Sequence, residues 1–211
     1  MTFLEICQRV RMDAGISGEG PAAVTGQIGI LSKVVVWVTK AVLDIQINRN
    51  QWSFLWASAS SNTQIGKKSY TPADLNIPTV KELSVVLIGT KEVVVKKWDW
   101  WLENIRKEGK ADVPGSPLYI TMSPDNKIHM YPVPEKVEVI TFDYYRKPVA
   151  VSANTDIPVI PADFHQAIVE KALIYYAQYE DDDYRYQQST IAFNDWMNSL
   201  SRDYLPEITF G

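Results

Sequence analysis

One short segment of this sequence combines the residue types that bind ring-shaped or anionic groups. It holds three tryptophans within four positions, Trp98, Trp100 and Trp101. Five cations surround them, Lys96, Lys97, Arg106, Lys107 and Lys110. Indole rings that stack and cations that neutralise phosphates occur together in proteins that bind single-stranded nucleic acid. Tryptophan and arginine are also enriched in protein interfaces.

Acidic residues within the same segment reduce its positive charge. They are Asp99, Glu103 and Glu108. Asp99 is expected to cap a short amphipathic helix near 99–109, and Gly109 is expected to end it. We therefore favour a helix that packs on a sheet through one or two tryptophans. A nucleic-acid site, a protein interface and a carbohydrate- or peptide-binding patch formed by Trp98, Trp100 and Trp101 stay open as alternatives.

The remaining reactive residues do not form a catalytic pattern. His129 and His165 are the only histidines, and the sequence contains neither a G-x-S-x-G element nor a pair of histidines at metal-binding spacing. The acidic run at 181–183 lacks the glycine and terminal glutamate of a calcium loop, so a solvated turn is favoured. Cys7 lies on the apolar face of a predicted helix. We predict a protein that is not an enzyme and that has no cofactor and no metal site.

The bulk composition limits the possible partners. The 211 residues are 46% hydrophobic and carry a formal net charge of −4, so no global positive field attracts DNA or an acidic membrane. A single cysteine excludes an internal disulfide framework and fits synthesis in a reducing cytoplasm. No signal peptide and no membrane-spanning segment is expected.

The apolar pattern predicts an α+β fold. Residues 1–57 and 158–205 show helical spacing and are expected to form one helical bundle. Thr2 and Glu5 form a capping box at the first helix, and the acidic run is expected to break the last helix in two. Residues 58–157 contain short β-rich runs separated by turn residues, which predicts an inserted antiparallel β domain. Residues 206–211 are expected to form a protruding tail.

Several motifs, taken in order, resemble a known family. The chain has Tyr131, Pro132 and Pro134 at the end of a hairpin and the Tyr-Tyr-Arg-Lys-Pro run at 144–148. These precede a helix entry with Pro161, Phe164, His165 and Ala172. A Trp-x-Phe-Leu element, Trp52, Phe54 and Leu55, follows an N-terminal helix. This order is similar to that in the bacteriophage head-to-tail adaptor, or head completion, proteins, which include the tail tubular protein A type.

The resemblance implies a structural part of the virion neck. Such proteins form a ring, commonly of twelve copies, beneath the portal protein. The ring continues the channel through which double-stranded DNA passes during genome ejection, without sequence-specific binding, and it docks a tail or nozzle protein. The expected interface residues are Trp98, Trp100, Trp101, Arg106, Lys107, Leu205, Ile208 and Phe210. The alternative function is a carbohydrate- or peptide-binding module of a phage tail.

Overall fold

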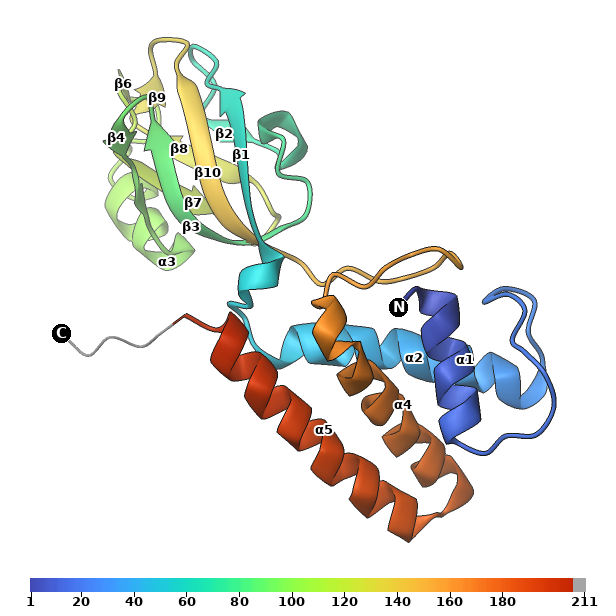
Figure 1. The fold of residues 1–211 in the computed structure, drawn as a ribbon. Helices are drawn as coiled ribbons and strands as arrows, with labels where there is room; N and C mark the ends of the chain where they lie inside the picture. Colours follow the sequence, from blue (N-terminus) through green and yellow to red (C-terminus); the bar gives the residue numbers. More distant parts are fainter. Residues whose placement is uncertain (207–211) are drawn as a thin grey trace. The chain divides into compact units, whose positions relative to one another are not determined.

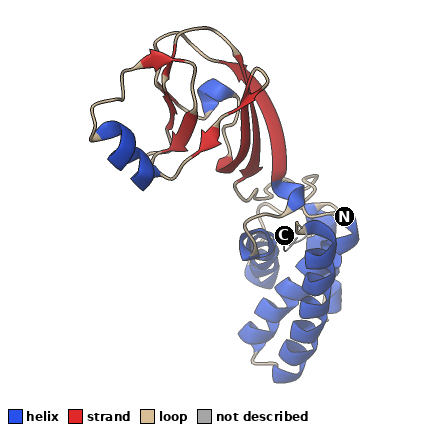
Figure 2. Cartoon of the chain, turned by 90° about the vertical axis from the view of Figure 1, so that its left-hand side faces the viewer, coloured by secondary structure: helices blue, strands red, loops and turns tan. Residues whose placement is uncertain are grey.

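A computed structural model describes residues 1–206. The chain divides into two compact units, which are described separately. The helical unit comprises Met1–Leu55 and Pro148–Gly211, and the β unit comprises Trp56–Lys147. Figure 1 traces the chain through both units, and Figure 2 distinguishes their helices from their strands. The predicted α+β class, with helices from both ends of the chain and a β region between them, is confirmed.

The helical unit has a central helix with neighbours on several sides. Its helices are α1 (Phe3–Asp13), α2 (Gly29–Asn48), α4 (His165–Glu180) and α5 (Asp183–Tyr204). Helix α4 contacts α1, α2 and α5 (Figure 1). Its buried positions therefore extend over most of its circumference, from His165 to Ala177. None of the helices within residues 1–206 is both long and apolar enough to cross a membrane.

Local signals determine where these helices begin and end. The predicted capping box is present, because the backbone N–H of Thr2 donates to Glu5 Oε2 at 2.7 Å and that of Glu5 donates to Thr2 Oγ1 at 3.3 Å. The acidic run separates α4 from α5 as predicted. Asp181 ends α4 with a left-handed φ of 53°, and Asp182 Oδ1 caps α5 by accepting from the N–H of Arg185 at 2.9 Å.

A buried glutamine connects α2 to the segment that follows the β unit. The side chain of Gln46 is fully buried. Its Nε2 donates to the carbonyl oxygens of Val42 at 3.0 Å and Val149 at 2.9 Å, while its Oε1 accepts from the N–H of Val149 at 2.8 Å. One amide thus satisfies both backbone groups of Val149, and it attaches the returning chain to the helical unit.

The β unit is built on two four-stranded sheets. The first has the order β1-β10-β3-β4, and its strands are β1 (Trp56–Asn62), β3 (Val80–Ile88), β4 (Lys91–Glu92) and β10 (Val139–Arg146). The second has the order β2-β8-β7-β5, and its strands are β2 (Ser69–Tyr70), β5 (Val94–Val95), β7 (Tyr119–Met122) and β8 (Ile128–Tyr131). A two-residue pair joins β6 (Pro114–Gly115) to β9 (Val133–Pro134).

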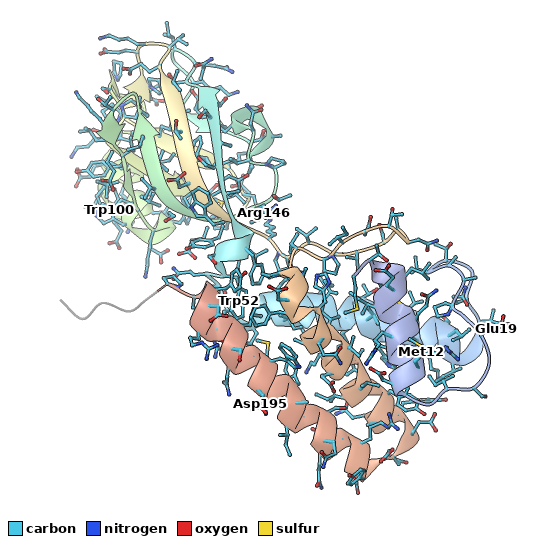
Figure 3. All side chains as sticks on the ribbon, in the orientation of Figure 1. Met12, Glu19, Trp52, Trp100, Arg146 and Asp195 are labelled. Carbon is cyan, nitrogen blue, oxygen red and sulfur yellow. The ribbon has the colours of Figure 1, made fainter. Side chains whose placement is uncertain are left out.

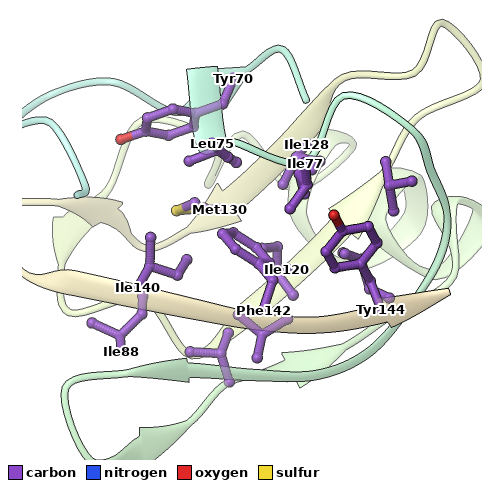
Figure 4. Close-up of a cluster of buried hydrophobic side chains, with 14 residues drawn as sticks. Tyr70, Leu75, Ile77, Ile88, Ile120, Ile128, Met130, Ile140, Phe142 and Tyr144 are labelled. Atoms are coloured by element: carbon purple, nitrogen blue, oxygen red, sulfur yellow. The ribbon is translucent and has the colours of Figure 1, made fainter. Parts of the chain in front are cut away.

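Most of these strands pair in the predicted antiparallel direction. The exceptions are the two-residue pairs β5–β7 and β6–β9, which are parallel. Alternate residues of β10 are buried, Ile140, Phe142 and Tyr144, and they meet Ile120, Ile128 and Met130 in the core of the β unit (Figure 4). Each of these β-rich runs therefore buries one face, as expected for apolar residues that alternate along a strand.

We expect Gln46→Leu to destabilise the helical unit. The substitution keeps the volume similar but leaves the N–H and C=O of Val149 without their partner, which should lower the free energy of unfolding by about 2 kcal/mol. Urea unfolding of the full chain measures this change. Gln188→Leu, at an exposed position on α5, is the matched control. Equal effects of the two substitutions would contradict the role given to Gln46.

Candidate functional site

A short helix holds the tryptophan-rich segment against the second sheet. Helix α3 (Trp98–Trp101) continues into a π-helical turn at Leu102–Arg106. The predicted cap at Asp99 is wrong, because Lys97 occupies the N-cap position without a side-chain bond and Asp99 lies in the first turn. The carboxylate of Asp99 is still favourable in the first turn, because it lies near the positive end of the helix dipole. Gly109 follows with a φ of 67°, which ends the helical path as predicted.

The tryptophans pack on side chains that point out of one face of β7 and β8. Trp101 is 5% exposed, and its ring lies 5.9 Å from that of His129 and 6.4 Å from that of Tyr131. Trp98 lies 5.3 Å from His129, also between ring centres, and is only partly buried. The favoured interpretation, a helix anchored on a sheet by tryptophan, is therefore the one that the contacts support for these two residues.

Trp100 belongs to a separate aromatic contact. Its ring centre lies 4.9 Å from that of Tyr119, and Lys96 Nζ lies 5.0 Å from the centre of the Trp100 ring (Figure 3). The ammonium group of Lys96 is attracted to the negative face of the indole. Trp100 thus does not share the contacts of Trp98 and Trp101.

A pocket opens beside Trp98. It has a volume of about 250 Å³ and is lined by Lys68, Trp98, Trp101, Arg106, Ala111 and His129. The lining comes from α3, the turn that follows it, β8 and the residue before β2. Three chain segments far apart in sequence therefore form one hollow with two indoles, one imidazole and two cations.

The floor of this pocket contains a neutral histidine. His129 Nε2 lies 3.2 Å from Ser123 Oγ, and the hydroxyl of Ser123 is directed at Asp125 and at the carbonyl oxygen of Lys127, 3.0 Å away. Because the single hydroxyl proton is used in those bonds, the Nε2–H of His129 is the donor to Ser123 Oγ. Burial lowers the pKa of His129 below its ordinary value, since the charged ring loses water.

Most cations near the pocket already have acidic partners. Lys68 pairs with Asp112, Lys110 pairs with Glu108, and Lys107 Nζ lies 3.7 Å from Glu103 Oε1. The guanidinium of Arg106 forms no hydrogen bond or ion pair with any residue in 1–206. Arg106 is thus the available positive charge at the pocket edge.

Comparison with known proteins identifies the family of this chain. The family model described as SU10 adaptor protein matches residues 1–208. The chain belongs to the SU10 adaptor family. This is a family of phage head-to-tail adaptors, so the suspected relationship is confirmed and the chain is a bacteriophage adaptor protein and a structural component of the virion. No curated protein matches the chain.

The predicted interface residues of the adaptor do not form a single site. Trp98, Trp101 and Arg106 line the pocket, whereas Trp100 and Lys107 make the separate contacts given above. Leu205 lies in the helical unit, where it ends α5 and its N–H donates to the carbonyl oxygen of Ser201 at 3.1 Å. Ile208 and Phe210 lie outside the described residues. The interface role of all eight residues stays a prediction.

The other titratable residues of the adaptor have structural contacts. His165 Nε2 lies 2.9 Å from the carbonyl oxygen of Ile160 and Nδ1 lies 2.8 Å from the amino group of Met1; burial lowers the pKa of its ring. Cys7 is fully buried, and burial raises the pKa of its thiol to about 12. Within residues 1–206, no His, Cys, Asp and Glu side chains are grouped to hold a metal ion.

Two residues of the pocket lining, Lys68 and His129, were not predicted as part of the site. They lie beside β2 and on β8, away from the tryptophan-rich segment in sequence, and Thr121 of β7 lies opposite His129 outside the lining. The alternation along residues 119–123 and 127–131 places Thr121 and His129 on one sheet face. That alternation is the sequence signal from which their common position follows, but it does not indicate which helix covers them.

The stability of the β unit should fall between pH 7 and pH 5 because of His129. The ordinary pKa of histidine is 6.5, and the folded value is lower, so the unfolded chain takes up the proton first as the pH falls. Stability is therefore lost on acidification in this range. Urea unfolding at several pH values should show a flatter profile for His129→Gln than for the unmodified adaptor. Parallel profiles would contradict this prediction.

Proposed function

We propose that this chain assembles head to tail with copies of itself into a ring at the virion neck, between the portal protein and the tail. The match to an adaptor family over residues 1–208 carries the proposal. The ring, commonly of twelve copies in proteins of the resembled type, continues the DNA channel below the portal and docks a tail or nozzle protein. The chain acts by binding its neighbours and does not act as an enzyme.

Two helices offer surfaces for contacts between copies. On α2, Val36 is 60% exposed and Ile47 is 59% exposed. On α5, Tyr184 is 75% exposed and Ile191 is 59% exposed. Residues three, four, seven and eleven positions apart share a helix face, so each pair lies on one side of its helix. Exposed apolar side chains of this size, gathered on one face, are typical of interaction surfaces.

These two faces fit the geometry of a ring. A contact that closes a ring joins one surface of a copy to a different surface of the next copy. Lys40 follows Val36 by one helical turn and pairs with Asp44 at 3.9 Å on the same face, whereas Asp195 follows Ile191 by one turn (Figure 3). We assign the contact to α2 of one copy and α5 of its neighbour, with the exposed apolar side chains at its centre.

The charge distribution supports passage of DNA without adhesion. The helical unit contains eight lysines and arginines against fourteen aspartates and glutamates, whereas the β unit contains thirteen against eleven. Binding of DNA without sequence preference depends on cations that neutralise phosphates. We propose that the acidic helical unit provides the surface of the channel, where repulsion keeps the duplex mobile.

We expect Val36→Asp and Ile191→Asp each to prevent ring formation with the portal protein. Both positions are exposed, so each variant should fold, while a buried carboxylate opposes the contact by at least about tenfold in affinity. Electron microscopy of the chain mixed with its portal protein counts the rings. Val137→Asp, at an exposed position of the β unit, is the control.

Mixing the two variants tests the head-to-tail arrangement. Each variant keeps one intact face, so an equimolar mixture should form dimers that do not grow further, whereas either variant alone should not. Analytical ultracentrifugation at high concentration distinguishes these species. Rings formed by either variant, or a mixture that behaves like its components, would contradict the assigned contact.

We expect the purified chain to bind double-stranded DNA more weakly than about 10⁻⁴ M at physiological salt, the weak end of non-specific binding. The net charge of −4 opposes the duplex, and Arg106 is the one pocket-lining cation without an acidic partner among residues 1–206. Fluorescence anisotropy of a labelled duplex measures the affinity. Micromolar binding that weakens steeply with added salt would contradict the proposed sliding surface.

A further inference from the structure

The pocket beside Trp98 is not explained by ring assembly. Trp101 and His129 fill the space under α3, while Trp98 keeps part of its indole exposed at the pocket. Trp98 also borders a second hollow, whose charged lining residues are Lys81, Glu82, Lys96 and Lys97. An aromatic surface with cations around it is a feature of ligand sites, and packing alone does not require it.

A buried hydroxyl below the helix has no partner. Thr121 faces His129 directly in the β7–β8 register, so both side chains lie on the sheet face that α3 covers. Thr121 is fully buried, and its Oγ1 forms no hydrogen bond with any described residue. A buried hydroxyl without a partner is costly, but Thr121 does not line the pocket, so its hydroxyl does not identify a ligand.

The hydrogen-bonding state of His129 gives the pocket a polar group. Since its Nε2–H donates to Ser123 Oγ, the neutral ring keeps Nδ1 as an acceptor. The pocket lining therefore offers one acceptor nitrogen beside the indole of Trp98. A ligand with a hydroxyl group can donate to this nitrogen, whereas a purely apolar side chain leaves it without a partner.

The charge at the pocket edge selects for a negative ligand. The guanidinium of Arg106 has no acidic partner among the described residues, and Lys68 shares the same lining. A guanidinium binds a carboxylate or phosphate through two parallel hydrogen bonds. The pocket volume of about 250 Å³ is below that of most drug-sized sites, so it holds one ring and its charged substituent.

We propose that this pocket binds a single sugar ring that carries a carboxylate or a phosphate. The face of the ring stacks on Trp98, one of its hydroxyls donates to His129, and its anionic group pairs with Arg106. A nucleic-acid base is less well matched, because single-strand binders use several exposed aromatic rings in succession and Trp101 is 5% exposed. This binding is independent of ring assembly, which uses the helical unit.

Ligand titration of the full chain by NMR tests the site. Methyl β-D-glucuronide and glucose 6-phosphate are the anionic probes, and methyl β-D-glucoside is the neutral one. The tryptophan indole N–H signals report contact, with the Trp98 signal assigned through Trp98→Phe. We expect at least one anionic probe to shift this signal and to bind at least tenfold more tightly than the glucoside; which one does so identifies the anionic group.

Variants separate binding from folding. Arg106→Gln should remove the tenfold preference for the anionic probe, and His129→Phe should weaken both anionic and neutral sugars. Lys107→Gln is the matched control, since it removes a cation from the next residue, which does not line the pocket. Indole signals that keep their dispersion show that each variant is folded.

Three results would overturn the proposal. The first is that none of the sugars shifts the Trp98 signal at the highest soluble concentration. The second is that Arg106→Gln and Lys107→Gln have the same effect. The third is that thymidine 5′-monophosphate binds more tightly than glucose 6-phosphate, which would indicate stacking of a base. A variant that does not form rings, such as Ile191→Asp, should bind the sugar with unchanged affinity. Ring assembly and sugar binding can therefore be tested separately, and failure of one proposal does not prevent a test of the other.

Discussion

The architecture depends on the antiparallel pairing of β1 with β10. Trp56, the first residue of the β unit, pairs with Tyr145, two residues before its last. The chain thus enters and leaves this unit at neighbouring points. Because these two points are adjacent, α1 and α2 can form one helical unit with α4 and α5. The 92 residues of the β unit separate the two helical segments in the sequence. The bonds between Gln46 and Val149 then hold the returning chain in place.

The parts of the fold that could be predicted from the sequence are those with a strong local signal. The capping box at Thr2, the break at the acidic run and the alternation of β10 each depend on residues within a few positions. Strand β1 was missed because its sequence, WASASSN, has no β-branched residue and is held by pairing with β10. The cap at Asp99 was wrong because the N-cap lies two residues earlier, at Lys97.

Only those residues of the site that lie within one short segment of the sequence could be predicted. Tryptophan and arginine spacing indicated a surface at 98–106, and it placed Trp98, Trp101 and Arg106 in it. Two partners from elsewhere in the chain could not be identified, since the ring of His129 and the ammonium of Lys68 reach the site through sheet register. Nothing in the local sequence shows which sheet face a separate helix covers.

An insertion whose two ends meet has a consequence for how such a protein can change over evolution. The helical framework requires only that residues equivalent to Leu55 and Pro148 lie close enough to be joined. Whatever is spliced between them, provided that its own ends are adjacent, leaves the framework intact. The β unit can therefore be enlarged, trimmed or exchanged while the helical framework that carries it is retained.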